Sequence, residues 1–408
     1  MNGADTAWIL TSTALVLFMT LPGLALFYAG LVRAQNVLFV LMNCFAIAYV
    51  ISIVWLALAY SIAFGYGGSG NQLWGGLGKS FLAGVGIDTV RDGTELPESL
   101  FFMFQMTFAI ITPALIVGAY VERIHFSFVL MFSVVWVLLV YAPVVHWVWG
   151  GGFLADEGVI DFAGGIVVHV TAGVSALVLA IMLGRRRGFP NELQPPHNPG
   201  MTMIGAAMLW VGWVGFNAGS ALAADGVAGM AMTVTHLSAA AGAIAWSVME
   251  LILYRKASLI GAVTGMVAGL ATITPASGSV GAIGGLVLGL AGGVICFTVT
   301  QMIKQRFKID DSLDVFAVHG VGGALGTLLA AIFISTALGG NGLADGMTMG
   351  GQLGIQAYGI LVGAVWAGVL TFIIVKVLAL FVPFRVSEEN EVQGLDLAMH
   401  GESGYHNF

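Results

Sequence analysis

Residues 161–184 read DFAGGIVVHVTAGVSALVLAIMLG, and residues 311–335 read DSLDVFAVHGVGGALGTLLAAIFIS. Each stretch is apolar and long enough to cross the ~30 Å hydrocarbon core of a bilayer as a helix. In each, the opening aspartate precedes a histidine by eight residues: Asp161 precedes His169, and the aspartate of the second stretch precedes His319. Eight residues cover ~12 Å of helix, so both histidines are predicted to reach the membrane interior. Ionisable side chains are costly there, and their default interpretation is functional.

The composition of the whole chain also indicates a membrane protein. Of its 408 residues, 58% are hydrophobic and 9% are charged, whereas about a quarter of the residues of a soluble protein are charged. Apolar runs of helical length recur from end to end, which excludes a β-barrel built from strands of ~10 alternating residues. Cys44 and Cys296 lie in such runs, so we expect buried thiols and no disulfide. No basic segment precedes the first run, which argues against a cleavable signal peptide.

We predict an all-α polytopic membrane protein with eleven transmembrane helices. The predicted crossings lie at about 7–31, 37–64, 98–120, 126–148, 163–184, 199–222, 226–254, 258–274, 279–303, 315–335 and 351–382. The last has about 32 residues, or ~48 Å of helix, so it must tilt steeply or protrude from the bilayer.

The distribution of positive charges predicts the orientation. Arg33, Arg123 and Arg185–Arg187 are among the basic residues that follow odd-numbered crossings, whereas the loops after even-numbered crossings hold only Lys79 and Arg91. Because positive residues favour the cytoplasmic side, the N-terminus is expected outside and the C-terminus in the cytoplasm. The expected location is the inner (plasma) membrane.

The equal offsets of the two histidines also predict an internal symmetry. The helices that begin near Asp161 and Asp311 are the fifth and tenth crossings, and the charge pattern makes them run in opposite directions. Five helices followed by five of opposite orientation form an inverted repeat, an architecture common in transporters. We therefore expect a transmembrane domain over residues 1–383, with repeats at about 7–184 and 199–335 and the eleventh helix at about 351–382. A cytoplasmic tail is expected over 384–408.

Several polar residues allow more than one interpretation. The two histidines could each bond a backbone carbonyl, but their symmetric placement favours a pair. A metal site would need further ligands, and the only candidates near either histidine in the sequence are the two aspartates, so no metal is predicted. Asp161 is either an N-cap or a group that favours a cation and assists proton removal, or both. Trp149 is either an interfacial aromatic or a π-face for a small cation. His236 has no symmetric counterpart and is expected to bond a neighbouring helix.

Five internal motifs resemble signatures of the ammonium transporter (Amt/Mep/Rh) family. They are Ala25–Arg33, Asp161–His169, Gly212–Ser220, Thr274–Ala276 and Asp314–Gly320. The resemblance extends over essentially the whole chain, and the tail motifs Gly394-Leu395-Asp396 and His400-Gly401-Glu402 are similar to those of the bacterial Amt branch. Ala29 stands where members often have glycine, a minor departure.

The resemblance implies a role for individual residues. An outer ammonium-binding site is implied for Phe108, Trp149 and Ser220, and a pore gate for Phe108 and Phe216. His169 and His319 are implied to line the pore and relay a proton, with Asp161 orienting the site or favouring deprotonation. Gln105 and Thr274 are expected to contribute less.

The resemblance also implies partners and excludes others. It implies ammonium or ammonia as substrate, a homotrimer in membrane lipid, and a tail able to dock a PII-type signalling protein; it implies no cofactor and no nucleic acid. Hydrolase and metalloprotease motifs do not occur, so no enzyme activity is predicted. Two alternatives are an ammonium sensor that regulates a soluble partner and a Rh-like gas channel.

Overall fold

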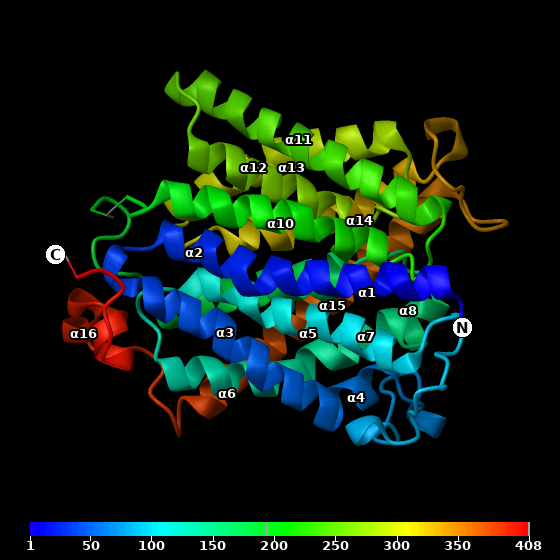
Figure 1. Ribbon diagram of the computed structural model, residues 1–408. Helices are drawn as coiled ribbons and strands as arrows, with labels where there is room; N and C mark the ends of the chain where they lie inside the picture. Colours follow the sequence, from blue (N-terminus) through cyan, green and yellow to red (C-terminus); the bar gives the residue numbers. More distant parts are fainter. Residues whose placement is uncertain (193–194, 407–408) are drawn as a thin grey trace.

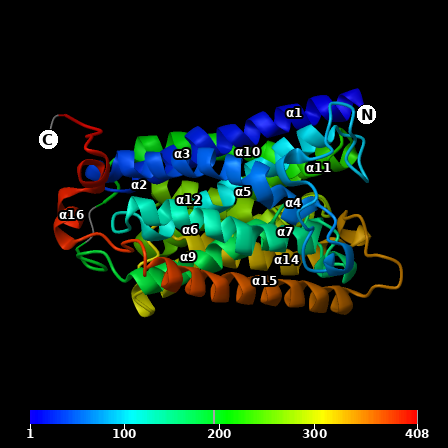
Figure 2. The ribbon, with the colours of Figure 1, turned by 90° about the horizontal axis from the view of Figure 1, so that it is seen from below.

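The computed structural model describes residues 1–192 and 195–406. Its long helices run roughly along one direction, and the two termini lie at opposite ends of the bundle (Figures 1 and 2). A chain whose termini lie at opposite ends of a bundle traverses it an odd number of times.

Ten helical stretches within the described residues are long and apolar enough to cross a membrane. They are Gly3–Leu31, Ala34–Phe64, Glu98–Tyr120, Phe126–Asp156, Gly165–Leu183, Pro199–Gly219, Gly226–Tyr254, Ala282–Arg306, Phe316–Phe333 and Met349–Leu378. Several of them join α-helices through π-helical turns. The α-helices are α1 (Gly3–Phe18), α2 (Ala25–Leu31), α3 (Val37–Val54), α4 (Tyr60–Phe64), α5 (Glu98–Tyr120), α6 (Phe126–Trp136), α7 (Ala142–Trp149), α8 (Phe153–Asp156), α9 (Thr171–Leu183), α10 (Pro199–Gly219), α11 (Gly226–Tyr254), α12 (Leu259–Ile273), α13 (Ala282–Gln301), α14 (Gly322–Phe333), α15 (Met349–Leu378) and α16 (Glu388–Gln393).

The predicted all-α membrane fold is confirmed. The described residues form helices, turns and two isolated β-bridges, and they contain no β-strand. Each predicted crossing overlaps a helix, but the eighth corresponds to α12, which has 15 residues and rises only ~22 Å. The number of eleven crossings, the inverted repeat and the domain boundaries therefore stay predictions.

Helices α11, α12 and α13 pack against one another through glycines. A Cβ on Gly242 would overlap the backbone oxygen of Gly265, and one on Gly269 would overlap the backbone oxygen of Ser238. Small residues let helix backbones approach in this way, and dispersion forces between them replace the hydrophobic effect that lipid cannot supply.

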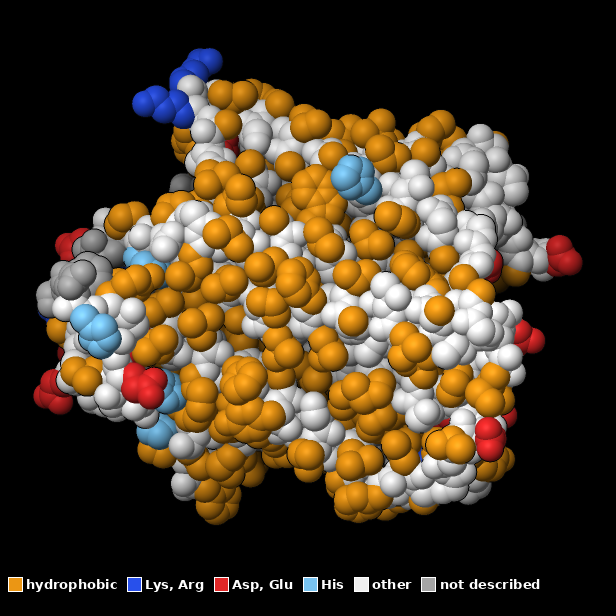
Figure 3. All heavy atoms as spheres, viewed as in Figure 1, with side chains coloured by type: hydrophobic (Ala, Val, Ile, Leu, Met, Phe, Trp, Pro, Cys, Tyr) orange, Lys and Arg blue, Asp and Glu red, His pale blue; other side chains and the backbone are white. Residues whose placement is uncertain are grey.

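The surface carries the distribution of side chains that a bilayer requires. Figure 3 shows hydrophobic side chains over the middle of one face, whereas charged side chains gather toward its two ends. Large hydrophobic residues are exposed on several helices, among them Ile53 on α3, Ile244 on α11 and Leu361 on α15. In water such a surface would be an aggregation liability, so it indicates contact with lipid or with another protein.

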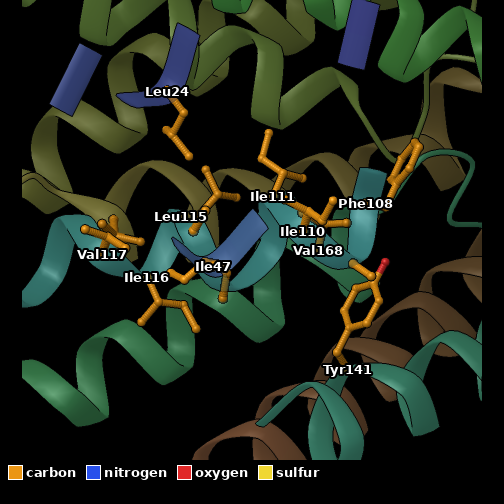
Figure 4. Packing of buried hydrophobic residues seen from close by; sticks show 14 of the residues in the cluster. Leu24, Ile47, Phe108, Ile110, Ile111, Leu115, Ile116, Val117, Tyr141 and Val168 are labelled. Carbon is orange, nitrogen blue, oxygen red and sulfur yellow. The ribbon is translucent and has the colours of Figure 1, made fainter. Parts of the chain in front are cut away.

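Helix α5 forms the centre of the bundle. Nearly all of its side chains are buried, and Figure 4 shows its residues Phe108, Ile110, Ile111 and Leu115 packed among residues of several other helices. A helix that is apolar all round belongs in the interior of a bundle. The residues on α5 are therefore held on every side.

The tail after α15 folds back onto the end of the bundle (Figure 1). Glu391 on α16 accepts hydrogen bonds from the backbone N–H of Arg187 (2.7 Å) and from Nη2 of Arg385 (2.8 Å). Asp396 accepts a hydrogen bond from the N–H of Phe39 (2.7 Å) at the start of α3. The acidic tail is thus held in place by polar contacts with distant segments.

Candidate functional site

The structure brings His169 and His319 into direct contact. Their Nδ1 atoms are 3.2 Å apart, their rings lie at 23° with centroids 5.1 Å apart, and both residues are buried. At this distance one Nδ1 donates and the other accepts, so at least one imidazole is a neutral acceptor. The pair therefore shares one proton along this bond.

Close backbone contact makes this pairing geometrically possible. His169 lies in the π-helical turn Gly165–Val170 before α9, and His319 lies in the turn Phe316–Val321 before α14. A Cβ on Gly173 would overlap the backbone of Gly320, so glycine is required where the two segments cross. The rings meet because the backbones behind them can touch.

Aromatic rings surround the histidine pair. Trp213 and Phe216, both on α10, lie nearly parallel to the His169 ring, with centroids 5.7 Å and 6.2 Å from it. The indole Nε1 of Trp213 donates to Oγ1 of Thr274 (2.9 Å). Thr274 therefore holds the indole of Trp213 in place beside His169. The rings of Trp213 and Phe216 make the surroundings of His169 largely apolar.

Two phenylalanines lie next to the histidine pair. The rings of Phe108 and Phe216 are 4.3 Å apart and tilted by 32°, and both residues are buried. Phe108 also contacts Trp149 edge-on, with centroids 6.1 Å apart at 87°. Phe108 and Phe216 thus connect Trp149 to His169 through a series of ring contacts.

A cavity of about 190 Å³ lies against Phe108. It is lined by Phe64, Phe101, Gln105, Phe108, Trp149, Phe162, Ser220 and Leu222, so it contains all three residues proposed for the outer site. The indole Nε1 of Trp149 donates to the backbone oxygen of Asp161 (2.7 Å), which fixes the indole plane. The hydroxyl of Ser220 donates to the backbone oxygen of Phe216 (2.8 Å), so its lone pairs can accept a proton donor in the cavity.

Asp161 caps the segment that carries His169. Its two carboxyl oxygens accept hydrogen bonds from the N–H groups of Gly164 (2.9 Å), Gly165 (2.5 Å), Ile166 (2.8 Å) and Val167 (3.0 Å). A carboxylate has about four acceptor positions, and these bonds occupy them. The geometry supports the N-cap interpretation, in which the carboxylate also meets the positive end of the helix dipole.

Asp311 has the equivalent position before His319 but different contacts. Its Oδ2 accepts a hydrogen bond from the N–H of Phe316 (2.7 Å), whereas its buried Oδ1 has no hydrogen-bond partner among the described residues. Burial, together with the neighbouring charge of Asp314, raises the pKa of Asp311 to about 7. The two aspartates have the same spacing from a histidine but different hydrogen-bond partners.

This raised pKa predicts a pH dependence of stability. In an unfolded chain an aspartate has a pKa of ~3.9, so Asp311 stabilises the fold fully below that pH and loses this contribution as pH rises through about 7. The melting temperature in detergent should therefore fall more steeply from about pH 5 to about pH 8 in the wild type than in Asp311→Asn, which cannot ionise. Asp88→Asn, at an exposed loop position, is the control and should follow the wild type. Equal slopes for Asp311→Asn and wild type would contradict the assignment.

A second cavity, of about 500 Å³, lies at the other end of α5, beyond Tyr120. It is lined by Phe27, Leu31, Arg33, Glu122, Arg186, Arg187, Gly188, Glu192, Pro196, Ile260, Thr264, Lys304, Ser312, Leu313, Asp314, Glu391 and Val392. Arg186 bridges Glu122 (3.1 Å) and Asp310 (2.9 Å). Burial raises the pKa of Glu122, but Arg186 and Arg33 outweigh it and hold the pKa below its ordinary value.

Sequence reasoning missed this ion-pair cluster. Glu122 and Asp310 stand next to the ends of predicted helices, where exposed charges are common, and their partner Arg186 lies more than 60 residues from each. The one available signal was that each stands beside a second charge, in Glu122-Arg123 and Asp310-Asp311.

The remaining polar candidates lie away from the pore. His236 is exposed on α11 and contacts the ring of Trp210, with centroids 5.1 Å apart. Cys44 and Cys296 are buried free thiols. Among the described residues, no group of three or more His, Cys, Asp or Glu side chains is placed to hold a metal ion.

Comparison with known proteins shows the family to which the chain belongs. Residues 7–405 match the model of the Ammonium Transporter Family. The chain is 45% identical over 407 residues to an ammonium transporter of Bacillus subtilis (strain 168), covering 99% of both chains. It is also 45% identical over 413 residues to a putative ammonium transporter of Methanothermobacter thermautotrophicus, again covering 99% of both.

Solved structures show the same fold. A sensor Amt protein superposes with a TM-score of 0.90 at 29% identity, covering 97% of this chain and 98% of the other. Mep2 of Candida albicans superposes with a TM-score of 0.87 at 32% identity, covering 99% and 91%. With a family match over nearly its whole length and relatives at 45% identity, the chain belongs to the ammonium transporter family.

Proposed function

We propose that the protein binds ammonium in the cavity beside Phe108 and Trp149, called the outer cavity below. The ion gives its proton to water in this cavity or to the histidine pair, and ammonia passes Phe108 and Phe216 to reach the pair. The observation that carries this proposal is the 3.2 Å contact between His169 and His319 directly behind two stacked phenylalanine rings. This arrangement gives a small solute one hydrogen-bonding site in an otherwise apolar path.

The outer cavity has the chemistry of a site for a small cation. The ring faces of Trp149 and Phe108 attract a cation electrostatically, by about 0.5–2 kcal/mol each depending on exposure. Ser220 adds an acceptor for one N–H. Because Asp161 is occupied by four backbone N–H groups, we assign it to orienting this region, through its backbone oxygen on Trp149, and assign it no direct contact with the ion.

Deprotonation is energetically competitive with passage of the intact ion. An intact charge at the bilayer centre costs ~3 to more than ~10 kcal/mol. If ammonium loses its proton like a lysine side chain of pKa ~10.4, deprotonation at pH 7 costs at most ~5 kcal/mol. A potassium ion has no proton to lose, so a narrow apolar path rejects it.

The decisive test is simultaneous measurement of uptake and current in proteoliposomes. After an inward ammonium step, the wild type should accumulate ammonium and should exclude potassium at the same concentration. Current that accompanies uptake would show that the proton also crosses, whereas uptake without current would show conduction of ammonia alone. Absence of uptake with the protein folded in the bilayer would rule out the proposal.

A second candidate function is ammonium sensing through a soluble partner. It is favoured by the likeness to a protein titled a sensor Amt protein and by the position of the tail, since Glu391 and Val392 line the inner cavity. A PII-type signalling protein docked at this face is the partner we propose. Binding of such a protein without any ammonium uptake would favour the sensor, and transport of carbon dioxide in place of ammonia would favour a gas channel.

We also propose that the protein is a homotrimer in the plasma membrane. His236 is exposed in the middle of apolar α11, and the buried Nε1 of its neighbour Trp210 has no partner among the described residues. Polar groups facing lipid are costly, so contact of His236 with another subunit would relieve this cost. Native mass measurement in detergent should give three chains; a monomer would contradict this.

The orientation we propose follows from the charges. Basic residues such as Arg33, Arg186 and Lys304 gather around the inner cavity, and positive residues favour the cytoplasm. The N-terminus would then be outside and the tail cytoplasmic, which labelling of terminal tags in intact cells can test.

A further inference from the structure

Gln105 is a polar residue of the outer cavity to which the proposed mechanism assigns no role. Its side chain lines the cavity, and the residue is only 8% exposed. Its buried Oε1 has no hydrogen-bond partner among the described residues. Buried amides are nearly always hydrogen-bonded, so an unpartnered amide beside a cavity indicates that its partner is a molecule in the cavity.

The position of Gln105 follows from the regular spacing of α5. Phe101, Gln105 and Phe108 are separated by four and three residues, which places them on one face of a helix, and all three line the cavity. The α5 backbone is buried among other helices, so it holds the amide at the edge of the cavity. The amide stays one helical turn outside the ring that gates the path.

We propose that the carbonyl oxygen of Gln105 is a ligand of the outer ammonium ion and sets the preference for ammonium over alkylated amines. The inference rests on the proposed function of this cavity. Ammonium has four N–H donors in a tetrahedron, and the aromatic faces of Trp149 and Phe108 provide no oxygen acceptor. Ser220 takes one N–H and Gln105 takes another. Rotation about the last side-chain bond exchanges the oxygen and nitrogen of the amide, so either face of the group can present the oxygen.

The chemistry of the bond predicts both affinity and selectivity. A hydrogen bond from a cation to a buried oxygen is stronger than one between neutral groups. Methylammonium has a methyl group in place of one N–H. If a leucine replaces Gln105, methylammonium can place its methyl against that leucine, whereas ammonium loses a bond and gains nothing.

The test compares Gln105→Leu with wild type for both substrates in proteoliposomes. We expect the half-saturation concentration for ammonium to rise about tenfold to hundredfold, the loss typical of one hydrogen bond to a charged group. The value for methylammonium should rise less, so that the preference for ammonium shrinks, and the maximal rate should change little for either. The rise for ammonium reports the lost hydrogen bond, because the leucine offers ammonium no contact in exchange.

Two further variants keep the test decisive. Gln393→Leu makes the same change at an exposed position on α16, outside the cavity, and should leave the preference unaltered. Gln105→Glu provides a charged acceptor, so it should lower the half-saturation concentration at neutral pH and lose this gain in acid. An unchanged ammonium half-saturation in Gln105→Leu, or equal rises for both substrates, would overturn the assignment. If wild type transports neither substrate, the proposed function itself fails, whatever the variants do.

Discussion

Replacement of Asp161 by alanine is expected to abolish transport and to destabilise the protein by several kcal/mol. The change removes the acceptor of four N–H groups at residues 164–167, and each buried unsatisfied group costs about 1–3 kcal/mol. The turn that holds His169 begins at Gly165, so its loss of order would displace the imidazole. Uptake per folded protein and the melting temperature in detergent are the measurements.

The comparison with Asp161→Asn separates the two roles that one carboxylate could have. The amide of asparagine retains one oxygen acceptor. If Asp161 acts only as a cap, Asp161→Asn should therefore keep part of the capping and be intermediate in stability and uptake. Asp156→Ala, at an exposed position of the same loop, is the matched control and should behave as wild type. If Asp161→Ala melts like the wild type yet does not transport, the carboxylate acts in deprotonation and not as a cap.

Replacement of His169 or His319 by leucine is expected to suppress the ammonium-dependent current by on the order of a hundredfold, the lower range for loss of a proton-transferring group. Leucine keeps most of the volume of the ring but has no nitrogen, so the remaining histidine loses its 3.2 Å partner. No proton can then pass between the two segments. Uptake of neutral ammonia should fall less than the current, because the path stays open to a small uncharged molecule.

Parallel recordings of uptake and current distinguish the possible outcomes. His406→Gln, on the exposed tail, is the control for a histidine outside the pore and should retain both signals. Uptake that persists while current vanishes assigns proton relay to the pair. Unaltered current in both leucine variants would show that the proton follows another route.

The helices could be predicted well because hydropathy and helical rise are local properties. The seventh crossing was predicted at 226–254 and corresponds to α11 with the same ends. Differences arise where a cap decides the end: Thr348 accepts a hydrogen bond from the N–H of Gly351, so α15 begins at Met349, two residues before the prediction. The outer boundary of a helix depends on such a side chain more than on the apolar run.

The convergence of the histidines was also accessible, since two equal offsets from an aspartate, together with the predicted helix directions, place both side chains in the membrane interior. The symmetry suggested equal roles for Asp161 and Asp311. Their equal spacing from a histidine is real, but their hydrogen-bond partners differ. Four N–H groups surround the first carboxylate, whereas the second retains an oxygen without a partner. Gln105 was noted only as a minor contributor, because an amide in an apolar helix has no distinctive sequence pattern.

The sequence by itself determined that the chain crosses a membrane as helices and that Asp161 and Asp311 each stand eight residues before a histidine. These conclusions depend on composition and spacing, which act along the chain. Only the tertiary structure decided that the two Nδ1 atoms meet at 3.2 Å, that Asp161 is a saturated cap, and that the amide of Gln105 faces a cavity. Hydrogen-bond satisfaction depends on atoms supplied by distant segments, such as those of His169 and His319, 150 residues apart, or Phe39 and Asp396, 357 residues apart. Their relative positions arise only when the helices pack.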